Sequence, residues 1–226
     1  MSKIFKIYNK LYGTYGPQGW WPFMDLNKYY HKLDYDYPKN ENQIFEVCLA
    51  SILTQNRSFK QVVQSLTNLK NANALDYKKI KTMPLDELKE LIKPSGYSNQ
   101  KSKYILNFID FFENLNGKIP NRDELLSIKG VGEETADSIL LYGFKQAHFK
   151  VDAYTKRLLI HNKLINEKTK YIEIKNFFEK ELEKEEKDKE KLVIIYQEYH
   201  ALIVCHAKLY YSKKPYGNGC FLDKVC

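Results

Sequence analysis

Residues 125–141 of the chain read LLSIKGVGEETADSILL, and residues 151–157 read VDAYTKR. In the first stretch, apolar residues at helical spacing stand on both sides of the turn Gly130-Val131-Gly132. Glycine permits backbone conformations that other residues avoid, and it lets the main chain approach a ligand closely. The stretch therefore predicts a helix, a tight turn and a second helix, whose free N–H groups and partial positive charge suit a phosphate. Considered alone, the same residues also fit a plain glycine turn between two packed helices.

The rest of the chain has the same helical character. Leu85, Leu88, Leu91 and Ile92 recur at three- and four-residue steps, and no sustained alternation of apolar and polar residues indicates strands. Clusters of Gly, Pro, Asn and Ser interrupt this pattern at residues 13–22, 34–42, 93–98, 117–121 and 129–132. We therefore predict an all-α protein of roughly ten helices joined by short turns.

The composition of the chain limits which classes of partner and which cellular compartment are expected. The chain has 226 residues, of which 43% are apolar, and 36 Lys and Arg against 28 Asp and Glu leave a net charge of +8. This excess favours an acidic partner, either nucleic acid or an anionic membrane surface. The first residues lack the long apolar run of a signal peptide or membrane span, and 4 cysteines are too few for a disulfide framework. We therefore expect a cytoplasmic protein without a membrane segment.

The pattern Gly-Val-Gly-x-x-Thr-Ala-x-x-Ile-Leu, followed by Val-Asp-x-x-x-x-Arg, resembles the helix-hairpin-helix, Gly/Pro-rich loop and aspartate signature (HhH-GPD) of DNA glycosylases. The Gly/Pro part is degenerate, since only Gly143 and the polar residues 145–150 lie between the hairpin and Asp152. The resemblance extends to ILTQN at 52–56 and GYSNQK at 96–101.

This resemblance implies an all-α, two-lobe glycosylase fold with the active-site cleft between the lobes. We expect one helical lobe at residues 43–150, which contains the hairpin, and a second lobe formed by residues 1–42 and 151–226. The expected partner is double-stranded DNA containing a damaged base, bound by a monomer.

Asp152 is the candidate catalytic residue. Breaking a base-to-sugar bond builds positive charge on the deoxyribose, and a fixed carboxylate stabilises that charge and assists attack by water. In isolation, an Asp before a helical segment is most often a helix N-cap, and both interpretations can hold for one residue.

The position of Glu134 indicates a monofunctional enzyme. Endonuclease III and its bifunctional relatives carry a lysine two residues after the second hairpin glycine, and its amine attacks the sugar to form a Schiff base. Glu134 occupies this position and cannot form one. Two acids in the first turn of a helix also complement the helix dipole, which is the simpler explanation of Glu133 and Glu134.

The C-terminal cysteines resemble half of the family's iron-sulfur motif. Cys220 and Cys226 match the last two ligands, but Tyr210 and Gly217 stand where the first two cysteines belong. We therefore expect no cluster and no other cofactor. Zinc is the alternative, with ligands drawn from His200, Cys205, His206, Cys220 and Cys226.

Aromatic residues near the N-terminus suggest a pocket for the flipped base, which enzymes of this type hold between aromatic or apolar faces. Together with the hairpin, the segment Trp20-Trp21-Pro22 and Phe45 resemble the branch of 3-methyladenine glycosylases that lacks the cluster. A cationic methylated purine suits electron-rich ring faces. Core packing is the alternative for each tryptophan.

The same resemblance suggests how DNA is held. Gln55 corresponds to the residue that fills the gap left by the flipped nucleotide, and Tyr97 to a wedge in the opposite strand. Both also fit a helix end and a partly buried ring. The candidate phosphate contacts are Lys101, Lys129, Gly130, Val131, Gly132, Lys156 and Arg157.

The sequence thus predicts a monofunctional glycosylase that removes alkylated purines, especially 3-methyladenine, in base excision repair. Two rivals stay open. One is an endonuclease III-like glycosylase and lyase for oxidised pyrimidines, and the other is a non-catalytic DNA-binding module.

Overall fold

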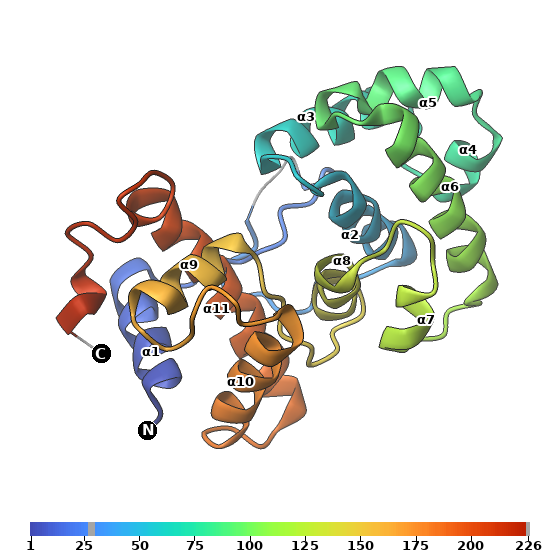
Figure 1. Cartoon of the computed structure of the whole chain (residues 1–226). Coiled ribbons are helices and arrows are strands. Elements are labelled where there is room, and N and C mark those ends of the chain that lie inside the picture. The colour runs from blue at the N-terminus through green and yellow to red at the C-terminus, as the bar shows by residue number, and fades with distance from the viewer. Residues whose placement is uncertain (27–29, 225–226) are drawn as a thin grey trace. The chain divides into compact units, whose positions relative to one another are not determined.

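The computed structural model describes residues 1–26 and 30–224, and every regular element in these ranges is a helix (Figure 1). This confirms the predicted all-α class. The α-helices are α1 (Lys3–Tyr15), α2 (Glu41–Leu53), α3 (Phe59–Asn71), α4 (Tyr77–Thr82), α5 (Leu85–Ile92), α6 (Ser98–Asn114), α7 (Arg122–Leu126), α8 (Glu133–Ser138), α9 (Ala153–His161), α10 (Tyr171–Glu183) and α11 (Lys189–Tyr210). Short helical turns follow at η1 (Lys93–Ser95), η2 (Ile139–Gly143) and η3 (Phe221–Lys224). No helix in the described part of the chain is both long and apolar enough to cross a membrane.

Local sequence signals account for where several helices begin. The side chain of Asn40 accepts a hydrogen bond from the Gln43 amide at the start of α2, and Asp188 caps α11 in the same way. Asn121 and Glu124 form a reciprocal capping box at α7. Such caps satisfy amides that have no partner within the helix.

The chain divides into two compact units. One, called here the terminal unit, comprises residues 1–20, 30–35 and 145–226, and the other, the hairpin unit, comprises residues 21–29 and 36–144. Residues 21–26 and 36–42, which the sequence analysis placed with the chain termini, are therefore part of the hairpin unit. The chain passes from the terminal unit to the hairpin unit between Trp20 and Trp21.

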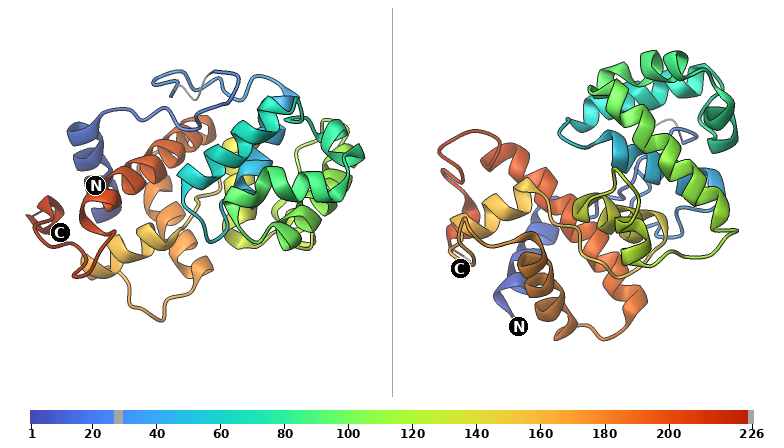
Figure 2. Two further views of the ribbon diagram at one scale, coloured as in Figure 1. Left: turned by 90° about the horizontal axis from the view of Figure 1, so that it is seen from above. Right: turned by 45° about the vertical axis from the view of Figure 1, so that its right-hand side comes forward.

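In the terminal unit, α11 packs against α1 and α9 (Figure 2). Ile4, Ile7 and Leu11 form the buried stripe of α1, and the Tyr199 hydroxyl of α11 donates to the Ile4 carbonyl at 2.8 Å. Phe149 stacks on Phe178 of α10 with ring centroids 4.2 Å apart. This packing brings the chain just before Asp152 against α10 and α11.

In the hairpin unit, α2 is the central helix. Ten of its thirteen residues are buried, and it contacts α3, α6, α8 and η2. A helix that is apolar on nearly all sides belongs in the interior of a domain. The second hairpin helix, α8, and the turn η2 that follows it therefore pack against this buried helix.

Candidate active site

The hairpin forms as predicted, with a turn between α7 and α8, but its two glycines have different roles. Gly130 has φ +105°, and a Cβ atom there would lie 2.2 Å from the ring of Tyr104 on α6. Gly132 has φ −97°, and a Cβ atom there would meet nothing within 4 Å. The conformational need for glycine that the sequence suggested at both positions therefore applies to Gly130 alone. Val131, between them, is buried.

Gln55 is attached to the hairpin. Its Nε2 atom donates to the Gly130 carbonyl at 2.8 Å and to the Thr135 hydroxyl at 3.0 Å. The structure thus brings together two of the predicted DNA-contacting segments, although they are 75 residues apart.

Lys101 does not have the role predicted for it. The residue is 2% exposed, and its ammonium donates to the carbonyls of Leu53 at 2.5 Å, Gln55 at 3.0 Å and Ser95 at 2.9 Å. Burial, aided by the charge of Arg57, lowers the pKa of Lys101 to about 8. With its donors directed at three carbonyls, Lys101 ties the segment after α2 to the turn before α6 and is not placed to bind a phosphate.

Tyr97, the predicted wedge, is available at the surface. It is 60% exposed and has the left-handed backbone conformation, φ +50°, at the start of α6. The guanidinium of Arg57 lies 5.0 Å from its ring centroid. A side chain on the preceding Gly96 would collide with that guanidinium, since a Cβ atom would lie 2.2 Å from it. Arg57 therefore supports the exposed ring. The sequence did not indicate this role, because only the fold brings Arg57 close to Tyr97.

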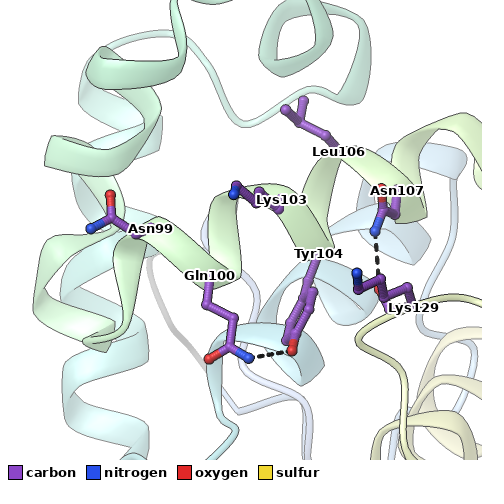
Figure 3. Close-up of a pocket in the computed structure, with 7 residues that line it drawn as sticks. All are labelled: Asn99, Gln100, Lys103, Tyr104, Leu106, Asn107 and Lys129. Atoms are coloured by element: carbon purple, nitrogen blue, oxygen red, sulfur yellow. Dashed lines mark hydrogen bonds between the residues drawn. The ribbon is translucent and has the colours of Figure 1, made fainter.

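An open groove of about 580 Å³ runs between α6 and the hairpin (Figure 3). Lys103 and Lys129 are exposed along it, and the Asn107 side chain donates to the Lys129 carbonyl at 3.2 Å. The remaining lining residues are Asn99, Gln100, Tyr104 and Leu106. Of the whole set, only Lys129 was predicted from the sequence as a DNA contact. Asn99, Lys103 and Asn107 recur every four residues, and this polar stripe was the available signal.

Asp152 caps α9 in the terminal unit, as the local sequence predicted. Its Oδ1 atom accepts hydrogen bonds from the Thr155 amide at 2.7 Å and the Thr155 hydroxyl at 2.9 Å. Its Oδ2 atom lies 3.4 Å from Nε2 of His200, and the side chain retains 13% exposure. The carboxylate is thus oriented from two sides.

Several groups keep Asp152 ionised. Burial by itself would raise the pKa of this carboxyl, but the interaction with His200, the charge of Lys150 and the Thr155 amide together hold the pKa well below its usual range. His200 lies on α11 and is 3% exposed. The sequence suggested only a zinc-ligand role for His200, because its proximity to Asp152 arises from the packing of α11 against α9.

Lys156 and Arg157, two other predicted phosphate contacts, have partners within the terminal unit. Lys156 donates to the Thr169 carbonyl at 3.1 Å. Arg157 donates to the Tyr211 carbonyl at 3.0 Å, and its guanidinium lies 4.6 Å from the ring centroid of Tyr216. Both side chains anchor α9 to neighbouring loops.

The predicted pocket aromatics do not form one cluster. Trp20, half-buried in the terminal unit, packs near Tyr30 with centroids 5.7 Å apart. Trp21 is 4% exposed in the hairpin unit, where it meets the rings of Phe59 and Tyr142 edge-on at 5.5 Å each. Pro22 is buried beside it in the chain.

Phe45 belongs to the core of the hairpin unit. It is 1% exposed and packs against Tyr77 at 5.8 Å and Phe112 at 5.5 Å, so it presents no free face to a base. This corrects the pocket assignment. Phe59, which is half-buried and touches Trp21, is the aromatic residue that the analysis missed. The only feature of the sequence that could have indicated Phe59 as a pocket residue is its position shortly after ILTQN, at the start of α3.

The residues of the C-terminal segment do not fit an iron-sulfur cluster. The ring of Tyr210 packs against His206 at 4.7 Å, and a Cβ atom on Gly217 would lie 2.3 Å from the His161 ring, so a cysteine has no room there. His206 is 3.2 Å from the Cys220 thiol and 2.9 Å from the Tyr15 hydroxyl, and burial lowers its pKa to about 4. Within residues 1–26 and 30–224, no three His, Cys, Asp or Glu residues converge on a metal position. Cys226 lies outside the described residues, and the absence of a cofactor stays a prediction.

Comparison with known proteins finds a family model and a relative that are both described as DNA repair proteins. A family model described as HhH-GPD superfamily base excision DNA repair protein matches residues 49–184. A Methanocaldococcus jannaschii protein provisionally named a DNA repair glycosylase is 41% identical over 99% of this chain and 95% of its own length.

Solved structures similar to the chain include the following two. One is an H. pylori 3-methyladenine DNA glycosylase, MagIII, bound to 1,N6-ethenoadenine, with TM-score 0.71, 29% identity and coverage of 92% of this chain and 98% of that one. The other is a non-covalent complex of endonuclease III with DNA, with TM-score 0.74 and 19% identity over 100% of this chain and 95% of that one. The second likeness concerns the fold alone.

Proposed function

This chain belongs to the HhH-GPD superfamily of base excision DNA repair proteins and is a DNA glycosylase, and from this premise we propose that it is a monofunctional enzyme for alkylated purines. The favoured substrate is 3-methyladenine in double-stranded DNA, and the products are the free base and an abasic site with an intact backbone. The observation that carries the proposal is the carboxylate of Asp152, ionised and oriented by Thr155 and His200. We expect the enzyme to act as a cytoplasmic monomer.

Asp152 acts on the sugar. As the N-glycosidic bond lengthens, the deoxyribose takes on oxocarbenium character, and a fixed anion stabilises this state more than it stabilises the neutral ground state. The Oδ1 atom is held by Thr155, which leaves the Oδ2 atom to face the reacting sugar or its attacking water. Nε2 of His200 lies 3.4 Å from that same oxygen.

The hairpin sequence supports attack on the sugar by water rather than by an amine of the enzyme. Glu134 lies in the first turn of α8, at the position where the bifunctional enzymes carry their nucleophilic lysine. A carboxylate there supports monofunctional chemistry. The alternative, a glycosylase and lyase for oxidised pyrimidines, has in its favour the fold shared with endonuclease III. It requires another amine, and Lys150, which is buried two residues before Asp152, is the nearest in sequence.

The aromatic cluster of Trp21, Phe59 and Tyr142 supports a purine substrate that carries positive charge. Ring faces attract cations, and a methylated purine has a weakened bond to the sugar, so it needs little further activation. The similarity to a 3-methyladenine glycosylase that binds ethenoadenine agrees with this substrate class. Phe59 is the accessible member of the cluster, and we propose that it contacts the base.

Contacts with the duplex come from the hairpin unit. The turn at Gly130, with Gln55 attached to it, binds the phosphate backbone, and exposed Tyr97 enters the stack. Lys103 and Lys129, on the groove in Figure 3, add positive charge for neighbouring phosphates.

The test is a panel of duplexes, each with one defined lesion, incubated with the enzyme and analysed for base release and for strand breaks with and without alkali. We expect release of 3-methyladenine, and breaks only after alkali. Asp152→Asn should bind DNA normally and release no base. Strand breaks without alkali, together with a borohydride-trapped complex, would establish the lyase alternative. Near-normal turnover by a folded Asp152→Asn variant would refute the mechanism.

A further inference from the structure

The two tryptophans of the chain are adjacent, Trp20 and Trp21, and the boundary between the terminal unit and the hairpin unit falls between them. On each side of this pair, the backbone is bound by a buried glutamate from a central helix. Neither glutamate belongs to the site described above.

On the N-terminal side, the glutamate is Glu198 of α11, which is 2% exposed. Its carboxylate accepts the Gln18 amide at 2.8 Å and the Gly19 amide at 3.2 Å, and it also accepts the Tyr35 hydroxyl at 3.4 Å. Gly19 has φ +64°, and a Cβ atom there would lie 2.3 Å from the Lys32 backbone. The residue before Trp20 is therefore fixed both by the carboxylate and by close packing.

On the C-terminal side, the glutamate is Glu46 of α2, which is 3% exposed. It accepts the Met24 amide at 2.9 Å, while Lys70 of α3 donates to the Met24 carbonyl at 2.5 Å. Next in the chain, Asp25 accepts a hydrogen bond from the Gln43 side chain at 2.8 Å. Both backbone groups of Met24 are thus bound by side chains, three residues after Trp21.

Burying an acidic group is costly unless hydrogen bonds compensate for the lost water. An apolar residue at either position would fill the same space without that cost. The glutamates provide acceptors for the amides of a segment whose described residues, 16–26 and 30–40, have no regular secondary structure. Only residues 20–23 separate the two bound points, Gly19 and Met24, and both tryptophans lie in that interval.

We propose that Glu198 and Glu46 are positioning residues. Within the terminal unit, Glu198 fixes the backbone before Trp20, and within the hairpin unit, Glu46 fixes the backbone after Trp21 and so holds that ring in place before the damaged base binds. This inference rests on the proposed function, because it treats Trp21, with Phe59 and Tyr142, as part of the base pocket. Preorganisation of this kind lowers the entropic cost of binding the flipped base.

The chain allows a direct test in the absence of DNA, because excitation at the red edge of the absorption band, where its 18 tyrosines do not absorb, makes its fluorescence come from these two tryptophans. In a Trp20→Phe background the emission reports on Trp21, and in a Trp21→Phe background it reports on Trp20. We expect Glu46→Ala to shift the emission of Trp21 to longer wavelength and to increase its quenching by acrylamide. Glu198→Ala should do the same for Trp20. Exposed glutamates of the same helices, Glu41 and Glu190, provide matched alanine controls that leave both spectra unchanged.

Glutamine variants distinguish positioning from loss of packing. The amide oxygen of Glu46→Gln can still accept the Met24 N–H, so this variant should keep the wild-type emission and quenching. If Glu46→Ala leaves Trp21 unchanged, or if the alanine and glutamine variants change it equally, the inference is wrong. Circular dichroism and urea unfolding of each variant identify any that fail to fold, and for such a variant the glutamine substitution alone decides.

Activity provides the second readout. We expect Glu46→Ala to lower kcat/KM for excision of 3-methyladenine by roughly tenfold, the value of one aromatic contact to a base, while its affinity for an abasic duplex stays within about twofold of wild type. Equal loss of excision and of abasic-duplex binding would overturn the inference. If the wild-type enzyme excises no alkylated purine, the proposed function fails, but the fluorescence result still decides the role of the glutamates.

Discussion

Replacing Gly130 with alanine tests the hairpin geometry most directly. The new Cβ atom would lie 2.2 Å from the ring of Tyr104, and the residue would keep φ +105°. Left-handed backbone costs an alanine about 1–2 kcal/mol, and forcing an extra carbon into a packed contact costs about 1–3 kcal/mol. We therefore expect Gly130→Ala to lower the free energy of unfolding by roughly 2–5 kcal/mol. Gly132→Ala, with no neighbour within 4 Å and φ −97°, is the matched control and should change it by less than about 0.5 kcal/mol.

A double-mutant cycle separates the two contributions. Tyr104→Ala removes the ring atoms that Gly130→Ala would strike but keeps its own Cβ atom, which would lie 2.7 Å from the new one. The double variant should therefore recover part of the packing loss of about 1–3 kcal/mol and retain the backbone part. Urea unfolding of the four proteins gives these energies. Affinity for undamaged and damaged duplexes should fall together in Gly130→Ala, because the hairpin contacts phosphates and the Gly130 carbonyl also holds Gln55. A Gly130→Ala protein as stable as wild type, or a cycle without coupling, would refute this account of the turn.

Three further predictions follow from the electrostatics. His200→Ala removes a group that lowers the pKa of Asp152, so the acid limb of the kcat profile should move to higher pH; an unchanged limb would mean that His200 does not act on the carboxylate. Lys103→Ala and Lys129→Ala should each reduce the slope of log affinity against log salt by about 0.9, and a slope equal to wild type would exclude phosphate contacts in the groove. Burial raises the pKa of Glu46 from 4.5 to about 8 despite its hydrogen bond from Met24, so the folded protein binds this proton more tightly than the unfolded chain. The free energy of unfolding should consequently fall as pH rises from 4.5 to about 8, by up to about 1.4 kcal/mol per pH unit. Urea unfolding at pH 5 and pH 8 measures this loss, which should be absent in Glu46→Gln.

Several features could be predicted from the sequence because they depend on residues close together in the chain. Each predicted break lies at helix ends, such as those around α1, α7 and α8, since glycine, proline and capping side chains act within one turn of the backbone. The ends of α3, α9 and α10 fall at no predicted break. The hairpin and the capping role of Asp152 are local in the same sense, since the carboxylate binds Thr155, three residues away. The all-α class follows from apolar spacing alone.

The errors concern residues whose environment is made by distant segments. Lys101 has the composition of a phosphate contact, but the carbonyls that bind it come from the end of α2 and from the turn before α6. Phe45 and Phe59 are both aromatic residues on helices near the same motif. Only the packing of α2 among α4 and α6 puts the first in the core, while the second stays half-buried beside Trp21.

His200 and the two positioning glutamates show the same limit. His200 is 48 residues from Asp152, and Glu198 lies 180 residues from Gln18. No periodicity or motif links such positions, because the orientation of a buried polar side chain depends on which backbone amide or carboxylate the fold places within hydrogen-bond distance. The sequence by itself determined the helices, the hairpin and the catalytic candidate, all of which follow from short-range backbone chemistry. The partners that orient the candidate carboxylate and the tryptophan segment were decided by the tertiary structure, since burial obliges each polar group to find a partner among whatever segments pack around it.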